Sequence, residues 1–446
     1  RPLGGLSTEV ALLDDVGVEK FKAYGFEGGT APTPHFDTLT RKGVLFERAY
    51  ASPICGPTRA AIQTGRYAFR TGFGTNMQAT DAPPAYRLPT RIESLPKMLN
   101  AGRPGTYAVG AFGKWHLTYN VGDDLHPNHL GYERFAGVLS NTAGAGNGSG
   151  HFDWRRVVDG ASTWVTGPPF DASQWQATVA ATDAKEWIEQ QSSPWFAYVA
   201  LNPPHAPFGA PPLELVSAPT RAALEAEGLE PGDNVPPDEP LALRVLAYDA
   251  MIEAIDTVLY DLVEFANARD ALILVVGDNG TPADIILPPF SPQHAKRTVY
   301  EQGIRVPLLA LGRGVNVPGR RSSALVHAVD LWRTIGEAAG ANIDPAWPTI
   351  DSVSFGPVLH DPDAPPPREY VYAESFRPNG LGKPVFAQQT IVHTRYKYIV
   401  YGGDEQFYDL ENDPLETDNK IVSGLSKREQ LILREMRDQL AALRAS

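Results

Sequence analysis

Four groups of reactive side chains each follow an apolar segment of the sequence within four residues. The side chains are Asp14 and Asp15, then Lys114 and His116, then His205, and then Asp278 with Asn279. The apolar segments before them cover residues 8–13, 106–112, 195–201 and 271–276, and short apolar runs of this length are typical of buried strands. Ligands of open α/β sheets bind at the carboxyl ends of the strands. We therefore expect these side chains to gather at one edge of a single sheet.

Each of these groups also has a plainer explanation when it is taken alone. An aspartate pair after a strand commonly forms a turn or caps a helix, and a lysine or histidine in a loop is usually solvated or structural. His205 lies between prolines and could be a turn residue. Four such coincidences at the ends of predicted strands favour one shared site.

The carboxylates of this set indicate a metal site. Three aspartates that converge without a counter-charge would repel one another and would be costly to bury, and a divalent cation removes that cost. The ligands would be Asp14, Asp15, Asp278 and Asn279. Because all four can offer oxygen, the set favours Ca²⁺ or Mg²⁺ over Zn²⁺. We prefer Ca²⁺, because its larger shell also admits a substrate oxygen.

The basic residues complement such a metal. Lys114 and Lys296 can neutralise a tetrahedral oxyanion whose charge the metal balances only in part. Two histidines, His116 and His205, then remain for proton transfer, one at the nucleophile and one at the leaving group.

Cys55 is the only cysteine in 446 residues, so no intramolecular disulfide can form. Pro57 suits the first position of a helix, residues 60–62 would continue that helix, and Gly65 would end it. Cys55 would then lie just before the helix N-terminus, where free N–H groups favour an anion or an oxyanion. Arg59 would lie one turn into the helix and could reach back.

Strands alternate with helices over residues 1–345, which predicts an α/β fold with a large, mostly parallel sheet between helices. Further on, the pattern changes to short alternating strands at residues 370–375, 385–393, 396–401 and 406–410. The last helix begins with the capping box Ser426-x-x-Glu429. We therefore expect a catalytic domain over residues 1–345. A small α+β subdomain with an antiparallel sheet and one helix would follow over residues 346–446.

Three segments have the composition of loops and would frame the site: residues 137–170, 203–240 and 281–295. Trp154, Trp164 and Trp175 could stack on a sugar or aryl ring, although core packing is the more common role of tryptophan. Asn147-Gly148-Ser149 matches a glycosylation sequon.

The overall charge excludes some classes of partner. The formal net charge is −13 and the pI is about 5.3, which argues against broad binding of nucleic acids or anionic membranes. No apolar run approaches the roughly 20 residues needed to span a membrane. The sequence leaves the oligomeric state open, and a periplasmic or secreted location is slightly favoured over the cytoplasm.

The segment around Cys55 resembles the C-x-P-x-R…T-G-R signature of the type I sulfatases, in the alkaline-phosphatase-like superfamily. In this chain it is Cys55-Gly56-Pro57-Thr58-Arg59 with Thr64-Gly65-Arg66. Thr58 stands where serine is commonest in the family. The resemblance runs nearly end to end and includes, in the family's order, Asp14-Asp15, residues 33–37, 113–116, 204–207 and 277–280, Lys296, and residues 301–307 and 407–414.

The resemblance implies an alkaline-phosphatase-like fold and a sulfuric ester hydrolase of the arylsulfatase type. A formylglycine-generating enzyme would oxidise Cys55 to formylglycine. The hydrated aldehyde would attack the sulfur of a sulfate monoester, an aryl sulfate or a sulfated carbohydrate, and release the alcohol. It would then eliminate sulfate.

The roles of single residues are likewise carried over from the family. The metal would be bound by Asp14, Asp15, Asp278, Asn279 and the modified Cys55. Arg59 would steady the modified residue, and Lys114 and Lys296 would hold the sulfate. His116 would assist the elimination of sulfate, and His205 would protonate the leaving oxygen.

Three other functions compete with this interpretation. A phosphonate monoester or phosphodiester hydrolase of the same superfamily can use the same cysteine-derived nucleophile. A thiol enzyme would pair Cys55 with His116, but it leaves the aspartates and both lysines unexplained. A non-catalytic protein that binds calcium or glycans would keep Cys55 unmodified.

Overall fold

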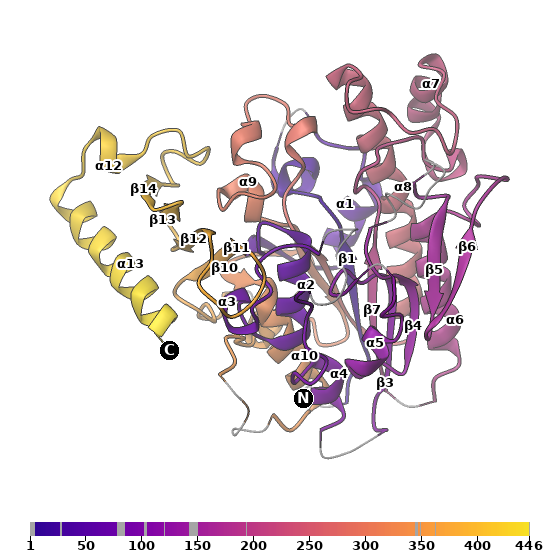
Figure 1. The fold of residues 1–446 in the computed structure, drawn as a ribbon, viewed down its shortest axis with the longest axis horizontal. Coiled ribbons are helices and arrows are strands. Elements are labelled where there is room, and N and C mark those ends of the chain that lie inside the picture. The colour runs from indigo at the N-terminus through magenta and orange to yellow at the C-terminus, as the bar shows by residue number, and fades with distance from the viewer. Residues whose placement is uncertain are drawn as a thin grey trace.

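The computed structural model describes residues 5–26, 29–77, 85–101, 105–119, 121–141, 150–192, 194–343, 347, 349–361 and 363–445. Within these residues the chain forms a ten-stranded sheet and a separate four-stranded sheet. Figure 1 shows the large sheet between helices, with the small sheet and the C-terminal helix to one side.

The large sheet has the strand order β10-β2-β9-β8-β1-β7-β3-β4-β5-β6. Its strands are β1 (Thr8–Leu13), β2 (Gly43–Tyr50), β3 (Ala108–Lys114), β4 (Arg134–Val138), β5 (Trp154–Val158), β6 (Ala161–Val165), β7 (Trp195–Leu201), β8 (Leu272–Gly277), β9 (Leu308–Gly312) and β10 (Arg320–His327). The five neighbours from β8 to β4 are all parallel. Strand β9 runs antiparallel to both of its neighbours, and β5 runs antiparallel to β4 and β6. The mostly parallel sheet expected from the sequence is thus confirmed.

Helices cover both faces of this sheet because its central strands are apolar on both sides. Along β1, Val10 and Leu12 pack into one core cluster, and Ala11 and Leu13 pack into the other. The first cluster includes residues of α2 (Cys55–Thr64), α4 (Leu95–Leu99) and α10 (Leu331–Ala339). The second includes residues of α1 (Pro34–Thr40), α6 (Gln176–Glu189) and α8 (Leu241–Asn267). Continuous burial of this kind is what parallel strands require.

The C-terminal region forms the predicted antiparallel sheet. Its order is β11 (Val371–Arg377), β12 (Phe386–Val392), β13 (Tyr396–Tyr401) and β14 (Asp404–Asp409). Helix α13 (Lys427–Ala445) packs against it through Leu433, Met436 and Leu440. The expected capping box is present, since the Ser426 N–H donates to Glu429 Oε2 and the Glu429 N–H donates to Ser426 Oγ.

Several segments that were expected to be irregular contain regular structure. The hairpin β5–β6 occupies part of the expected loop 137–170, and α7 (Ala218–Ala226) lies within residues 203–240. The edge strand β10 and the short helix α11 (Gly356–His360) were also not predicted. The sequences of β10 and α11 mix polar and apolar residues without a clear period, so tertiary packing decides their structure. The remaining short helices are α3 (Ala68–Thr71), α5 (His126–His129), α9 (Glu301–Ile304) and α12 (Lys420–Ser423).

Two sequence-based expectations cannot be compared with the structure. The sequon at residues 147–149 and the expected domain boundary at residues 345 and 346 lie outside the described residues. The tryptophans can be compared. Trp154 and Trp175 are buried in the core, whereas Trp164 on β6 is 55% exposed. In the described part of the chain, no helix has the length and apolar character needed to cross a membrane.

Candidate active site

The reactive side chains meet at the carboxyl edge of the large sheet, as the order of its strands requires. Strands β8, β1, β7 and β3 are consecutive neighbours, and in register Leu13 lies beside both Gly277 and Leu201. Asp14 and Asp278 therefore leave adjacent strands at the same level. Lys114 is the last residue of β3, and His205 follows β7 after a turn.

Asp278 and Asp14 share one face of the site with two cations. The Arg59 guanidinium donates to Asp278 Oδ2 through Nε at 3.1 Å and through Nη2 at 2.8 Å. Lys114 Nζ donates to Asp14 Oδ2. Arg59 Nη1 also donates to the Lys114 carbonyl at 2.6 Å, which ties the helix α2 to the end of β3.

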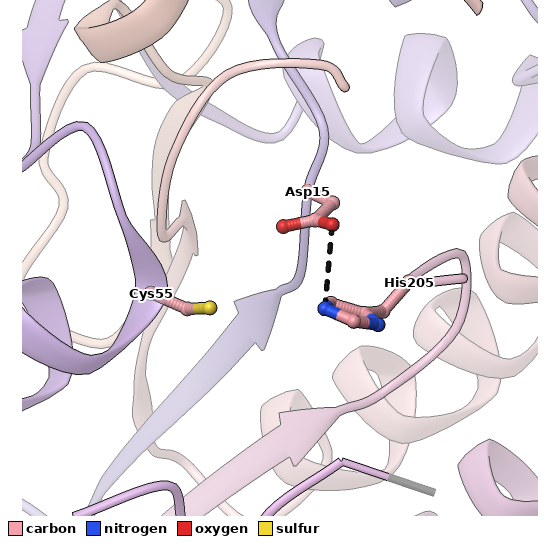
Figure 2. Close-up of side chains that lie close together, drawn as sticks. All are labelled: Asp15, Cys55 and His205. Carbon is pink, nitrogen blue, oxygen red and sulfur yellow. Dashed lines mark ion pairs between the residues drawn. The ribbon is translucent and has the colours of Figure 1, made fainter. Parts of the chain in front are cut away.

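Asp15 makes the contacts on the other side of the site. Lys296 Nζ donates to Asp15 Oδ1, and the Asn279 amide donates to the same oxygen at 2.9 Å. His205 Nε2 lies 3.8 Å from Asp15 Oδ2, and Figure 2 shows this pair beside Cys55. The Asp15 backbone has φ 62, a left-handed conformation that is uncommon outside glycine, and the Tyr248 hydroxyl donates to its carbonyl. Such backbone strain is concentrated at functional sites.

Three basic side chains of the chain itself lie against the aspartates, beside the cation site that the sequence predicts. Arg59, Lys114 and Lys296 each contact a carboxylate of the set. The balance between burial and these cations differs between Asp278 and Asp15, however. Burial and the neighbouring Asp14 carboxylate raise the pKa of Asp278 to about 7. Burial opposes ionisation of Asp15 too, but the Lys296 ammonium holds its pKa far below the usual range.

The donor set fits a divalent cation. Asp14, Cys55 and Asp278 each offer one ligand atom, and these three atoms lie within 4.8 Å of one another. The same holds for Asp15, Cys55 and His205. Asp14 Oδ1 and Asn279 Oδ1 are buried and have no hydrogen-bond partner among the described residues. Buried oxygens without a partner are costly unless a cation coordinates them. The Asn279 amide is oriented with its nitrogen toward Asp15, which leaves this oxygen available as the sequence-based assignment requires.

Cys55 begins helix α2 rather than preceding it, two residues earlier than Pro57 suggested. Its side chain is fully buried, and its Sγ lies 3.8 Å from Lys114 Nζ. Burial raises the pKa of this thiol. That is the opposite of what a thiolate nucleophile needs, so the environment of Cys55 does not favour the thiol-enzyme interpretation.

The two predicted histidines differ in what they contact. His205 Nδ1 donates to the Ala206 carbonyl at 2.8 Å, which leaves Nε2 facing the site. Burial and Lys114 lower the pKa of His205 to about 3, and a bound anion would raise it again. His116 is fully buried with Nε2 3.3 Å from the Met77 carbonyl, and burial with Lys114 and Arg59 lowers its pKa strongly.

Two residues of the site were not identified from the sequence. Asn76 Nδ2 donates to Cys55 Sγ at 3.2 Å, and its Oδ1 accepts the Gly56 N–H at 2.7 Å. His151 Nε2 donates to the His205 carbonyl at 2.8 Å and so restrains the loop that carries His205. Neither follows a predicted strand of the large sheet, which was the signal that pointed to the aspartates, Asn279, Lys114 and the two histidines.

The C-terminal region holds Asn76 in place through Asn379. The Asn379 side chain accepts the N–H groups of Gly74 and Thr75 at 2.8 and 2.9 Å and donates to the Thr75 carbonyl at 3.0 Å. Asn76 follows directly and contacts Cys55. A residue beyond the expected catalytic domain therefore positions a partner of the candidate nucleophile.

Replacing Asn379 with alanine is expected to lower stability by about 1–3 kcal/mol and to lower kcat by about tenfold. The three hydrogen bonds to the backbone of Gly74 and Thr75 are lost, and the segment that carries Asn76 becomes free to move. Urea unfolding and steady-state kinetics measure the two effects. Asn267→Ala, at the exposed last residue of α8, is the matched control and should change neither. An unchanged kcat in Asn379→Ala would refute the positioning role.

Comparison with known families agrees with this geometry. The family model described as Sulfatase matches residues 10–341. A second model, described as N-sulphoglucosamine sulphohydrolase, C-terminal, matches residues 293–446. The two matches together cover nearly the whole chain.

The individual relatives have low sequence identity to this chain. The chain is 26% identical over 482 residues to arylsulfatase G of Rattus norvegicus, which covers 95% of the chain and 84% of the relative. It is 27% identical over 370 residues to N-acetylgalactosamine-6-sulfatase of Homo sapiens, which covers 78% of the chain and 64% of the relative. The crystal structure of Ps i-CgsB in complex with k-i-k-neocarrahexaose has a TM-score of 0.75 at 22% identity, covering 99% of this chain and 93% of that one. This similarity confirms the fold.

Proposed function

Because the chain belongs to the sulfatase family, we propose that it hydrolyses sulfate monoesters with a formylglycine formed from Cys55 by a formylglycine-generating enzyme. The observation that carries the proposal is the set of groups around Cys55 Sγ. One cation, three carboxylates and a histidine have atoms close to this sulfur. The sulfur stands where an oxygen of the oxidised side chain would lie. In hydrated form that residue supplies one hydroxyl to attack sulfur and a second to expel sulfate.

The residues of the chain have separate tasks in this reaction. Lys114 and Lys296 bind the sulfate oxygens and balance the charge that grows in the transition state. His205 Nε2 faces the site and gives a proton to the leaving oxygen once the bound sulfate has raised its pKa. His116 removes a proton during the elimination of sulfate. Arg59 donates two hydrogen bonds to the carboxylate of Asp278 and so positions this proposed metal ligand beside the modified Cys55.

The metal of the site is proposed to be Ca²⁺, with Mg²⁺ as the weaker alternative. Asp14, Asp15, Asp278 and Asn279 would hold it together with the modified Cys55. Their oxygen donors suit a hard cation. When bound, the cation supplies electrostatic stabilisation of the sulfate and of the nucleophile's oxygen.

Removing the metal is expected to destabilise the protein as well as to inactivate it. A cation present at 100 times its Kd stabilises the folded state by about 2.7 kcal/mol. A chelator should therefore lower Tm, and added Ca²⁺ should restore both Tm and activity more fully than Mg²⁺. Differential scanning calorimetry and sulfate release measure this. If a chelator leaves Tm and activity unchanged, the metal assignment is wrong.

The substrate is proposed to be an aryl sulfate or a sulfated carbohydrate, since the relatives above are an arylsulfatase and a sugar sulfatase by name. The related alternative is a phosphonate monoester or phosphodiester hydrolase. Parallel kcat/KM values for 4-nitrophenyl sulfate and bis(4-nitrophenyl) phosphate separate the two. We expect the sulfate ester to be preferred, and a preference for the phosphate diester would contradict the proposal.

A further inference from the structure

A cavity of about 890 Å³ opens beside Cys55. Ile54, which precedes Cys55, and Asn76, which contacts its Sγ, line one side. The other side comes from β11, β12, β13 and the loop after β11. This volume is typical of small-molecule sites, which span about 300–1,000 Å³, so the cavity has room for the alcohol part of a sulfate ester. None of the described residues of the three loops expected from the sequence to frame the site lines this cavity.

The charged residues that line this cavity are two arginines, Arg297 and Arg377, and no carboxylate of the described residues joins them. Both side chains are exposed. Neither forms an ion pair with a carboxylate of the described part of the chain. In a chain with a net charge of −13, two such guanidinium groups give the lining of this cavity a local positive charge, which attracts anions.

The backbone of Arg297 is fixed although its side chain is exposed. Its N–H donates to the Pro53 carbonyl at 2.8 Å, and its carbonyl accepts from Gln388 Nε2. Gln388 on β12 is 2% exposed, and its Oε1 also accepts the Val299 N–H at 3.2 Å. Arg297 directly follows Lys296, the lysine proposed to hold sulfate. An anion bound to Arg297 would therefore be close to the reacting sulfate but distinct from it.

Arg377 is held by aromatic residues that also line the cavity. Its guanidinium carbon lies 5.3 Å from the centroid of the Phe386 ring, and this ring packs edge-on against Tyr401 at 5.7 Å. These rings offer apolar faces against which a sugar ring can pack. Ser375 and Thr75 add hydroxyl groups that can bond the hydroxyls of a sugar.

We propose that this cavity binds a sulfated saccharide that carries a second acidic group, either a carboxylate or another sulfate, and that Arg297 and Arg377 bind this second group. The proposal rests on the proposed function and adds a substrate class to it. The enzyme is thus selective for polyanionic sulfated saccharides over singly charged sulfate esters.

The test compares three disaccharides that share one cleavable sulfate ester. The first carries a uronate carboxylate, the second is the same molecule with the carboxylate reduced to an alcohol, and the third is the reduced molecule with an additional sulfate. Sulfate release from each gives kcat/KM for the full-length protein matured by a formylglycine-generating enzyme. 4-Nitrophenyl sulfate reports separately on the chemistry at Cys55.

We expect the wild type to prefer the first or the third disaccharide over the second by about 10- to 100-fold, the usual effect of hydrogen bonds to a charged group. Preference for the first identifies a carboxylate and preference for the third a second sulfate. Arg297→Gln and Arg377→Gln should each reduce this preference by about tenfold. Arg428→Gln, at an exposed position of α13, is the matched control and should keep it.

The inference and the proposed function fail in different ways. Suppose that the protein cleaves 4-nitrophenyl sulfate. The inference is then wrong if kcat/KM for the reduced disaccharide equals that for the two acidic disaccharides, or if none of the three disaccharides is cleaved. The same conclusion follows if both glutamine variants keep the wild-type preference. If no sulfate is released from any ester, including 4-nitrophenyl sulfate, the proposed function itself is wrong and the inference falls with it.

Discussion

Replacing Cys55 with alanine is expected to lower kcat/KM for sulfate esters by about 10⁴-fold or more, because removal of a covalent nucleophile costs that much in comparable enzymes. The alanine side chain can carry neither hydroxyl of the proposed nucleophile. The lysines, histidines and aspartates around it stay in place, so substrate binding should persist. Steady-state kinetics and a binding measurement with a sulfated ligand give the two quantities.

The serine variant separates the two halves of the proposed reaction. Cys55→Ser keeps one hydroxyl that can attack sulfur but has no second hydroxyl to expel sulfate. We expect turnover to be lost and a covalent sulfate ester to accumulate, visible as an increase in the mass of the peptide that contains residue 55. Turnover by Cys55→Ala within about tenfold of the wild type would contradict the proposed role of this residue.

Replacing Asp15 with asparagine is expected to lower kcat/KM by about 10²-fold or more and to weaken metal binding. Asp15 contacts Lys296, His205 and Asn279, so loss of its charge affects the proposed metal, a sulfate-binding lysine and the proton donor together. Asparagine tolerates the left-handed backbone at this position, so the change removes charge without adding strain. Kinetics and Ca²⁺ titration measure the two effects.

The chain offers a matched control for this substitution. Asp270 has φ 59, close to the conformation of Asp15, but it lies at an exposed turn, and within the described residues its carboxylate pairs with Arg313. Asp270→Asn should therefore leave kinetics and Ca²⁺ affinity unchanged. If Asp15→Asn behaves like Asp270→Asn, the carboxylate of Asp15 has no part in metal binding or catalysis.

The central sheet was predictable because its strands are apolar on both faces. The segments that became β1, β7 and β8 are short apolar runs, and buried parallel strands leave this signal. The hairpin β5–β6 leaves a much weaker signal, because all of β6 except its last residue is exposed and its sequence has no alternation. Strand β10 begins with two exposed arginines and pairs in register only after the fold has brought β2 beside it.

The candidate site was predictable for a related reason. Parallel strands deliver their carboxyl ends to one edge, so Asp14, Lys114 and Asp278 had to converge once the strands were known. Asn76, Asn379 and Arg297 were not found, because they lie on loops. Arg377 was not found, because it ends a strand of the C-terminal antiparallel sheet and not a strand of the large sheet. Their positions depend on how the C-terminal sheet packs against the large sheet, which no periodicity in the sequence encodes.

The mass of the tryptic peptide 49–59 from catalytically active protein shows whether Cys55 is converted to formylglycine. We expect this peptide to be lighter than its encoded sequence and to react with hydrazines, and we expect the modified fraction to rise in proportion to sulfatase activity. A peptide that keeps an unmodified Cys55 thiol in protein that hydrolyses sulfate esters at full rate would contradict this expectation.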